Sequence, residues 1–100
     1  MSERFRAGDV IHHLRYGYRG VVVERDAICM ADEAWYQGNQ TQPDRNQPWY
    51  HVIVDGAEHT TYVAEQHLEL DPDGGPVRNP MVEQVFKSFF KGRYYKESLN

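Results

Sequence analysis

The sequence contains a single cysteine, Cys29, so the chain cannot form an internal disulfide and lacks the thiolates of a cysteine-rich zinc site. No apolar run approaches the roughly 20 residues that span a bilayer. The first residues, MSERFRAGD, are polar where a signal peptide requires an apolar stretch. We therefore expect a cytoplasmic protein without a membrane partner.

Positive charge is also scarce, with 11 Lys and Arg against 15 Asp and Glu and a formal net charge of −4. This balance argues against a generic nucleic-acid binder that neutralises many phosphates. Residues 1–25 carry five Arg against three acids, residues 26–77 carry ten acids against Arg45 alone, and residues 78–96 carry five Lys and Arg against Glu83. The two ends could form one basic face, although a solvated acidic middle is the simpler interpretation.

Four segments have the composition of β-strands, namely residues 8–15, 18–25, 49–55 and 60–64. The first two flank Tyr16-Gly17, a weak hairpin signal that depends on Gly17 adopting a positive φ. Asp55-Gly56 is a strong turn dipeptide between the other two. Leu68 and Leu70 add a short edge strand, and the three consecutive valines at 21–23 indicate a strand that is covered on both faces or bent within a barrel wall.

A helix signature lies near the C-terminus, where Asn79 suits an N-cap, Pro80 the first helical position and Gly92 the end. This pattern predicts a helix over about residues 80–91. Its apolar stripe should pack on the barrel or on another subunit, and consists of Val82, Val85, Phe86 and Phe89.

These elements predict a mainly β fold within a single domain, residues 1–100. We expect a small, partly open five-stranded antiparallel barrel of SH3-like or OB-like class over about residues 5–70, with a C-terminal helix. A short helical insert is expected around residues 30–36, followed by a polar stretch at 37–48. A connection of this length is usually functional or mobile.

The sequence gives little support for catalysis or for a cofactor. His12 and His13 are neighbours on a strand, so their side chains should point to opposite faces and cannot ligate one ion. The other histidines lie on different elements. Cys29 has apolar neighbours, a setting that does not activate a thiol. We therefore expect no metal, no cofactor and no enzymatic activity.

Aromatic residues around the polar stretch indicate a binding surface, because they offer large contact area at low entropic cost. For a protein partner, the candidate residues are Trp35, Tyr36, Arg45, Arg19 and Trp49. Of these, Trp35, Tyr36, Arg45 and Arg19 are predicted to form one patch, whereas core packing is the simpler role for Trp49. For DNA, the candidate phosphate anchors are Arg15, Arg19, Arg25 and Arg45.

Four blocks, YGYRGVVV (16–23), DAIC (26–29), QPWYHVIV (47–54) and YVAE (62–65), resemble in order and spacing the YccV-like family, also called the hemimethylated DNA-binding domain, which includes heat shock protein HspQ. The resemblance runs roughly from Phe5 to Leu70. It implies an SH3-like barrel and a non-enzymatic binding role. In place of the acidic insert of enterobacterial members, the chain has residues 29–45. This insert and the tail are more similar to the C-terminal domain of certain eukaryotic F-box proteins.

The resemblance implies two functions that have been described for the family. The first is an HspQ-like accessory or adaptor role in protein quality control, promoting degradation by a protease such as Lon, with the ATP-dependent protease or its clients as partners. The alternative is a regulator that binds hemimethylated DNA at replication origins. A third hypothesis, a small hydrolase or ligand-binding barrel, rests on the aromatic residues alone. The sequence does not indicate the oligomeric state.

Overall fold

The computed structural model describes residues 4–98. Its elements follow the order β1 (Val10–His13), β2 (Arg19–Asp26), α1 (Glu33–Gln37), β3 (Trp49–Val54), β4 (Thr60–Ala64), the 3₁₀ turn η1 (Glu65–His67), β5 (Leu68–Leu70), α2 (Val82–Val85), β6 (Ser88–Phe90) and β7 (Arg93–Tyr95).

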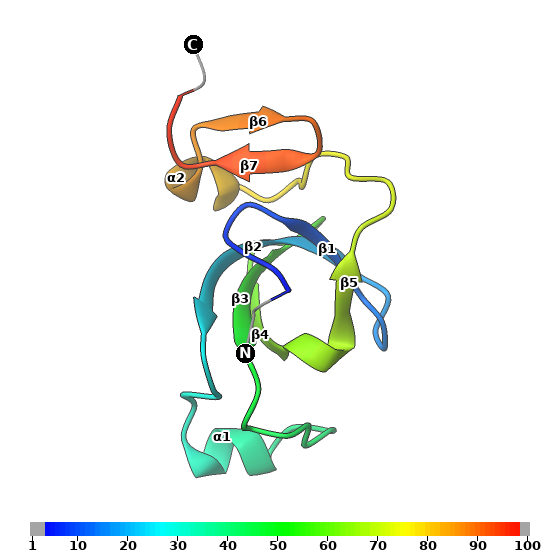
Figure 1. The fold of residues 1–100 in the computed structure, drawn as a ribbon, viewed down its shortest axis with the longest axis vertical. Helices are drawn as coiled ribbons and strands as arrows, with labels where there is room; N and C mark the ends of the chain where they lie inside the picture. The colour runs from blue at the N-terminus through cyan, green and yellow to red at the C-terminus, as the bar shows by residue number, and fades with distance from the viewer. Residues whose placement is uncertain (1–3, 99–100) are drawn as a thin grey trace.

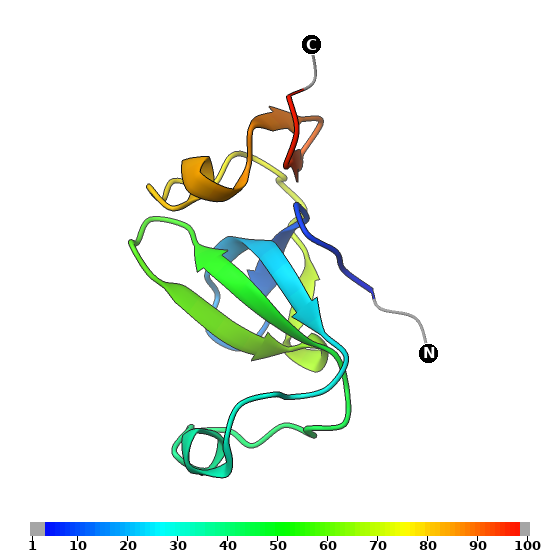
Figure 2. The ribbon, with the colours of Figure 1, turned by 90° about the vertical axis from the view of Figure 1, so that its left-hand side faces the viewer.

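The five strands β1–β5 form one antiparallel sheet in the order β4-β3-β2-β1-β5, so β4 and β5 are its two edges. The sheet curls into the partly open barrel that the sequence predicts (Figure 1). The insert, residues 27–48 with α1, lies at one end of the molecule, and α2 with the β6–β7 hairpin lies at the other, as the view in Figure 2 also shows. The mainly β fold class is therefore confirmed.

The valine run at the centre of β2 is both covered on two faces and bent. Val22 packs in the barrel interior, whereas Val21 packs on the outer face beneath the C-terminal segment. The register with β3 shifts between Val22 and Glu24, which marks a β-bulge. A bulge bends its strand and increases the local twist, as closing a small barrel requires.

Three apolar clusters are buried among the described residues: a small one of Cys29, Trp49 and Ala64 beneath the insert, and two larger ones, one inside the barrel and one outside it. The interior cluster contains Phe5, Ile11, Val22, Tyr50, Val52, Val63 and Leu68. The exterior cluster contains Val10, Val21, Ile53, Val77, Val82, Phe86 and Tyr94. The predicted stripe of the C-terminal segment does pack on the barrel, because Val82, Val85, Phe86 and Phe89 all belong to the exterior cluster or lie against it.

The predicted extent of the C-terminal helix, residues 80–91, is wrong. Within this range only the four residues of α2 are helical, and Phe86 already has extended dihedrals, φ −115° and ψ 146°. Beyond it, the Lys87 N–H donates to the Tyr95 carbonyl at 2.8 Å, and β6 pairs with β7. Aromatic residues favour strands, so the apolar spacing that suggested a helix is overridden by pairing with a second aromatic segment.

Gly92 ends a hairpin turn and not a helix. Lys91 and Gly92, with φ of 51° and 77°, are the two residues between the paired Phe90 and Arg93. Positive φ at both central residues is the signature of a type I′ turn, the tight hairpin connection. The hairpin docks on the barrel through Gly8, whose carbonyl accepts the Tyr94 N–H at 2.9 Å.

Candidate functional site

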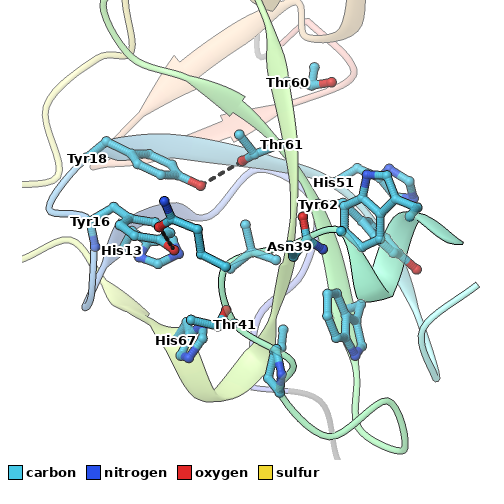
Figure 3. A pocket seen from close by; sticks show the side chains of 17 residues that line it. His13, Tyr16, Tyr18, Asn39, Thr41, His51, Thr60, Thr61, Tyr62 and His67 are labelled. Carbon is cyan, nitrogen blue, oxygen red and sulfur yellow. Dashed lines mark hydrogen bonds between the residues drawn. The ribbon is translucent and has the colours of Figure 1, made fainter. Parts of the chain in front are cut away.

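A groove of about 710 Å³ opens along β4 (Figure 3). Its walls come from β4 and neighbouring β3, from the β1–β2 turn with η1, and from the insert. The lining residues are His13, Tyr16, Tyr18, Trp35, Gly38, Asn39, Gln40, Thr41, Pro43, Trp49, His51, Thr60, Thr61, Tyr62, Val63, Ala64 and His67. Within the described part of the chain, this lining contains no Asp, Glu, Lys or Arg. A volume of this size is typical of ligand pockets.

Three aromatic rings form the wall at the insert end. The Trp35 ring meets Trp49 edge-on at 6.2 Å and Tyr62 at 5.7 Å between ring centroids, and Trp49 lies 5.3 Å from Tyr62. Trp49 is 2% exposed and belongs to the core, whereas Trp35 is 39% exposed. Trp35 is therefore the ring of this wall with the most surface left for a ligand.

Asp26, the last residue of β2, holds the polar edge of this wall. Its Oδ2 accepts the Tyr62 hydroxyl proton at 2.6 Å and lies 3.2 Å from His51 Nε2. Burial and the neighbouring carboxylate raise the pKa of the Tyr62 phenol. The Tyr62 hydroxyl thus stays protonated, and its hydrogen bond to Asp26 orients the ring.

Arg45 ties the insert together. Its Nη2 donates to the Ala31 carbonyl, its guanidinium lies 4.9 Å from the Tyr36 ring centre, and its own carbonyl accepts the Cys29 N–H at 2.9 Å. Its side chain is one-third exposed, lies 3.7 Å from Glu33 Oε1 and does not line the groove. Arg45 therefore has a structural task within the insert, and Cys29 is buried beside it.

The insert reaches across to the β1–β2 turn. Asp32 caps α1 by accepting the Trp35 N–H at 2.8 Å, and Tyr36 donates its hydroxyl to the Pro43 carbonyl at 2.8 Å. From the following residues, Gln40 accepts the Tyr16 hydroxyl at 3.3 Å. This last contact joins two walls of the groove, the insert and the β1–β2 turn.

His13 organises the wall of the groove that the β1–β2 turn and η1 form. Its Nδ1 accepts the backbone N–H groups of Arg15 and Tyr16 at 3.1 and 3.0 Å. Its ring lies 4.8 Å from Tyr16, 4.9 Å from Tyr18 and 5.5 Å from His67. Because Nδ1 is an acceptor in this geometry, the imidazole must be neutral with its proton on Nε2.

This environment predicts a loss of stability in acid. Burial, followed by the charges of His67, His12 and Arg15, lowers the pKa of His13 from 6.5 to about 4. The folded state then binds fewer protons than the unfolded state, so stability should be full above pH 6.5 and fall progressively towards pH 4. The loss is on the order of 3 kcal/mol, and urea unfolding at several pH values measures it.

His13→Asn is the matched variant for this prediction. The Asn Oδ1 can accept the same two N–H groups but does not titrate, so the difference in unfolding free energy between wild type and variant should shrink as the pH falls. Burial also lowers the pKa of His67, which leaves a smaller slope of the same sign in the variant. If the unfolding free energies of the two proteins fall in parallel with pH, His13 is not the group whose protonation destabilises the fold in acid.

The structure does not bring Arg19 together with Trp35, Tyr36 and Arg45. Arg19 begins β2, and the insert follows the other end of this eight-residue strand, about 23 Å away at a strand's rise per residue. Its guanidinium is paired with Asp55 and Asp71 at 2.9 and 3.0 Å. The single patch predicted from the sequence is therefore wrong in this respect, because a pairing within the fold occupies Arg19.

Two of the four candidate phosphate anchors remain on the surface. Arg15 is exposed beside the Tyr16 ring, with 5.9 Å from its guanidinium carbon to the ring centre, and Arg25 is exposed near the end of β2. Neither lines the groove. The other two, Arg19 and Arg45, hold the fold and the insert.

Sequence reasoning missed the second half of the site, formed by His13, Thr60, Thr61 and His67. His13 and His67 meet because β1 pairs with β5, where His13 lies opposite Leu68. The Tyr18 hydroxyl lies 2.7 Å from Thr61 Oγ1 across the mouth of the barrel. The only available signal was the Tyr16-Gly17-Tyr18 turn, whose two tyrosines stood out as aromatic.

Within residues 4–98, no group of three or more His, Cys, Asp or Glu side chains is placed to hold a metal ion. His12 is half-buried beside Glu69, with 2.9 Å between His12 Nδ1 and Glu69 Oε2, and points away from buried His13. In the same part of the chain, each helix is too short and too polar to cross a membrane.

Comparison with known proteins places these features in a family. Residues 3–93 match the model of the family described as "Hemimethylated DNA-binding protein YccV like". F-box only protein 21 of Mus musculus is 30% identical over 94 residues, and the proteins of that name from Pongo abelii and Homo sapiens are 29% identical. Each alignment covers 91% of this chain but 15% of the relative. No solved structure gives a significant match.

The chain thus spans about 15% of the length of the curated relatives it matches. The family is described by DNA binding and not by an enzymatic reaction, so the match supports a DNA-binding module. The resemblance identified from the four sequence blocks is confirmed, including the similarity to an F-box protein.

Proposed function

The chain belongs to the YccV-like hemimethylated DNA-binding family, and from that premise we propose that this member is a non-enzymatic recognition module whose groove binds a segment of a protein partner. The role is that of a cytoplasmic, HspQ-like adaptor in protein quality control, which holds clients for degradation by an ATP-dependent protease such as Lon. The observation that carries this proposal is the lining of the groove, which combines aromatic rings, hydroxyls and amides with no charged side chain.

This lining is suited to a peptide and poorly suited to a phosphate backbone. Arg and Lys supply the positive charge that neutralises phosphates, and neither residue type lines the described groove. Peptide recognition uses aromatic surfaces with hydrogen-bonding groups at their edges, as Trp35, Tyr62 and Thr61 provide here. A protein partner can therefore pair with the hydrogen-bonding groups of the groove through uncharged peptide groups, and no charged side chain of the groove requires an opposite charge.

Tryptophan fluorescence tests the proposal directly, because both tryptophans of the chain line the groove. The probe is an array of nine-residue peptides built from Ser, Thr, Asn, Gln, Tyr, Val, Ile and Pro, with a second array in which alternate residues are Asp or Lys. We expect binders in the uncharged array whose affinity changes less than threefold between 50 and 500 mM salt, because few charges meet on binding.

Trp35→Ala should weaken these binders about tenfold or more, which corresponds to about 1.4 kcal/mol. Phe90→Ala is the matched control, since Phe90 is also an exposed aromatic (53%) but lies on the hairpin at the opposite end. Equal losses in both variants, or binders confined to the charged array, would contradict a neutral peptide groove.

The second candidate function, binding of hemimethylated DNA, is favoured by the family match. Its test is titration with hemimethylated, fully methylated and unmethylated duplexes of one sequence at several salt concentrations. If DNA binds through the exposed arginines, Arg15→Ala and Arg25→Ala should each reduce the slope of log affinity against log salt by about 0.9. If the protein prefers the hemimethylated duplex and Trp35→Ala abolishes this preference, the groove binds DNA, and the proposal of a peptide groove is wrong.

A further inference from the structure

The groove follows the open edge of the sheet. All five residues of β4, Thr60–Ala64, line it, and β4 pairs only with β3 among the strands of residues 4–98. Successive residues of a strand point to opposite faces. A cavity that touches five consecutive residues therefore runs along the edge of the strand. Its accessible part is at Thr60, Thr61 and Tyr62, since Val63 and Ala64 are buried.

The register of β4 shows which backbone groups point into the groove. At one end the Val54 N–H donates to the His59 carbonyl at 3.2 Å, and at the other the Glu65 N–H donates to the Pro48 carbonyl at 2.9 Å. In antiparallel strands, facing residues that exchange backbone hydrogen bonds alternate with facing residues that do not. With Tyr50 opposite Val63 and Val52 opposite Thr61, this alternation assigns the bonds with β3 to Thr61 and Val63.

Thr60 and Tyr62 therefore direct their backbone N–H and C=O groups away from β3 and towards the groove. We propose that the partner binds as an added β-strand, an extended uncharged segment of about five residues that pairs with Thr60 and Tyr62 along the edge of β4. This inference rests on the proposed function, because it specifies how the same groove would hold a peptide. Strand addition to a free sheet edge is an established mode of peptide recognition.

The two faces of the added strand meet different chemistry. On the outer face, Tyr62 and its cross-strand neighbour His51 lie beside the ring of Trp35. On the inner face, Thr61 reaches Tyr18 across the mouth of the barrel. The segment should thus carry flat or aliphatic side chains towards Trp35 and small hydroxyl or amide side chains, such as Ser, Thr or Asn, towards Tyr18.

Backbone N-methylation of the bound peptide tests the mode of binding. The tightest binder of the uncharged array is resynthesised with an N-methyl group at each residue in turn, which removes one donor and blocks one edge. If the peptide pairs with β4, affinity should fall tenfold or more at alternate residues and little at those between them, because only every second N–H points to a given neighbour strand. Uniform losses, or losses without this period, would overturn strand addition.

Amide hydrogen exchange gives the matching readout on the protein. In the free chain, the Thr60 and Tyr62 amides should exchange faster than those of Thr61 and Val63, and binding of the same peptide should slow Thr60 and Tyr62 at least tenfold. Binding without this protection leaves the proposed function standing and removes strand addition. If no peptide of the array binds, both fail.

A second copy of the chain is the competing occupant of this edge. In that case Thr60 and Tyr62 would already be protected without peptide, and sedimentation would show a dimer that the peptide does not dissociate. This result would overturn the proposal. A monomer with exposed Thr60 and Tyr62 amides is the expected state.

Discussion

Replacing Arg19 with alanine should lower the free energy of unfolding by about 3 to 5 kcal/mol. Its guanidinium joins Asp55 and Asp71 and also donates to the Gly75 and Pro76 carbonyls. The Asp71 side chain is only 6% exposed. Without the arginine, this carboxylate would be buried without its counter-charge, and the loop that leads towards α2 would lose the contacts of Gly75 and Pro76 with the barrel.

Urea unfolding measures this effect, and Arg15→Ala is the control, because Arg15 is an exposed arginine of the same hairpin whose loss should change stability by less than about 0.5 kcal/mol. Partner binding by folded Arg19→Ala should remain near the wild-type value. If Arg19→Ala instead has the same unfolding free energy as Arg15→Ala but no longer binds the protein partner, Arg19 is a recognition residue, as the sequence alone had suggested.

Replacing Phe86 with alanine should cost about 3 to 5 kcal/mol, because its ring is 4% exposed in the cluster that joins the C-terminal segment to the sheet. Its centroid lies 5.5 Å from that of Tyr94, so the cavity would also loosen the β6–β7 hairpin. Thermal and urea unfolding measure the change.

Phe90→Ala is the comparison for this second variant, since Phe90 belongs to the same segment but is 53% exposed. We expect Phe90→Ala to be far less destabilising than Phe86→Ala. Equal and small losses in the two variants would mean that the C-terminal segment is not part of the folded core.

The barrel was predictable from the sequence because its signals are local. Alternating strands, the Asp55-Gly56 turn and Gly17, whose φ is 78°, each depend on neighbouring residues. The C-terminal segment was not, because the same aromatic residues satisfy helical spacing and strand pairing. Only the contact of β6 with β7 and the turn at Lys91 and Gly92 decides between the two.

The site was predictable only on the side where its residues are close in sequence. Trp35, beside the polar stretch, was identified by composition and lines the groove, whereas its neighbour Tyr36 packs against Trp49 and Arg45 and does not line it. His13 and His67 meet through the pairing of β1 with β5, and no local pattern reports such a contact. The partners of Arg19 and Arg45 within the fold were likewise not visible as a local pattern, because Asp55 lies 36 residues from Arg19 and Ala31 lies 14 residues from Arg45.

Site-specific photo-crosslinking tests the central claim, that the groove along β4 is the binding surface. A photoreactive benzophenone amino acid is placed at Tyr16, on the groove, or at Phe90, on the hairpin, two positions with matched exposure of 52% and 53%. With the tightest uncharged peptide, we predict a covalent adduct at position 16 and none at position 90. An adduct only at position 90, or at position 16 with hemimethylated duplex and not with peptide, would contradict the account.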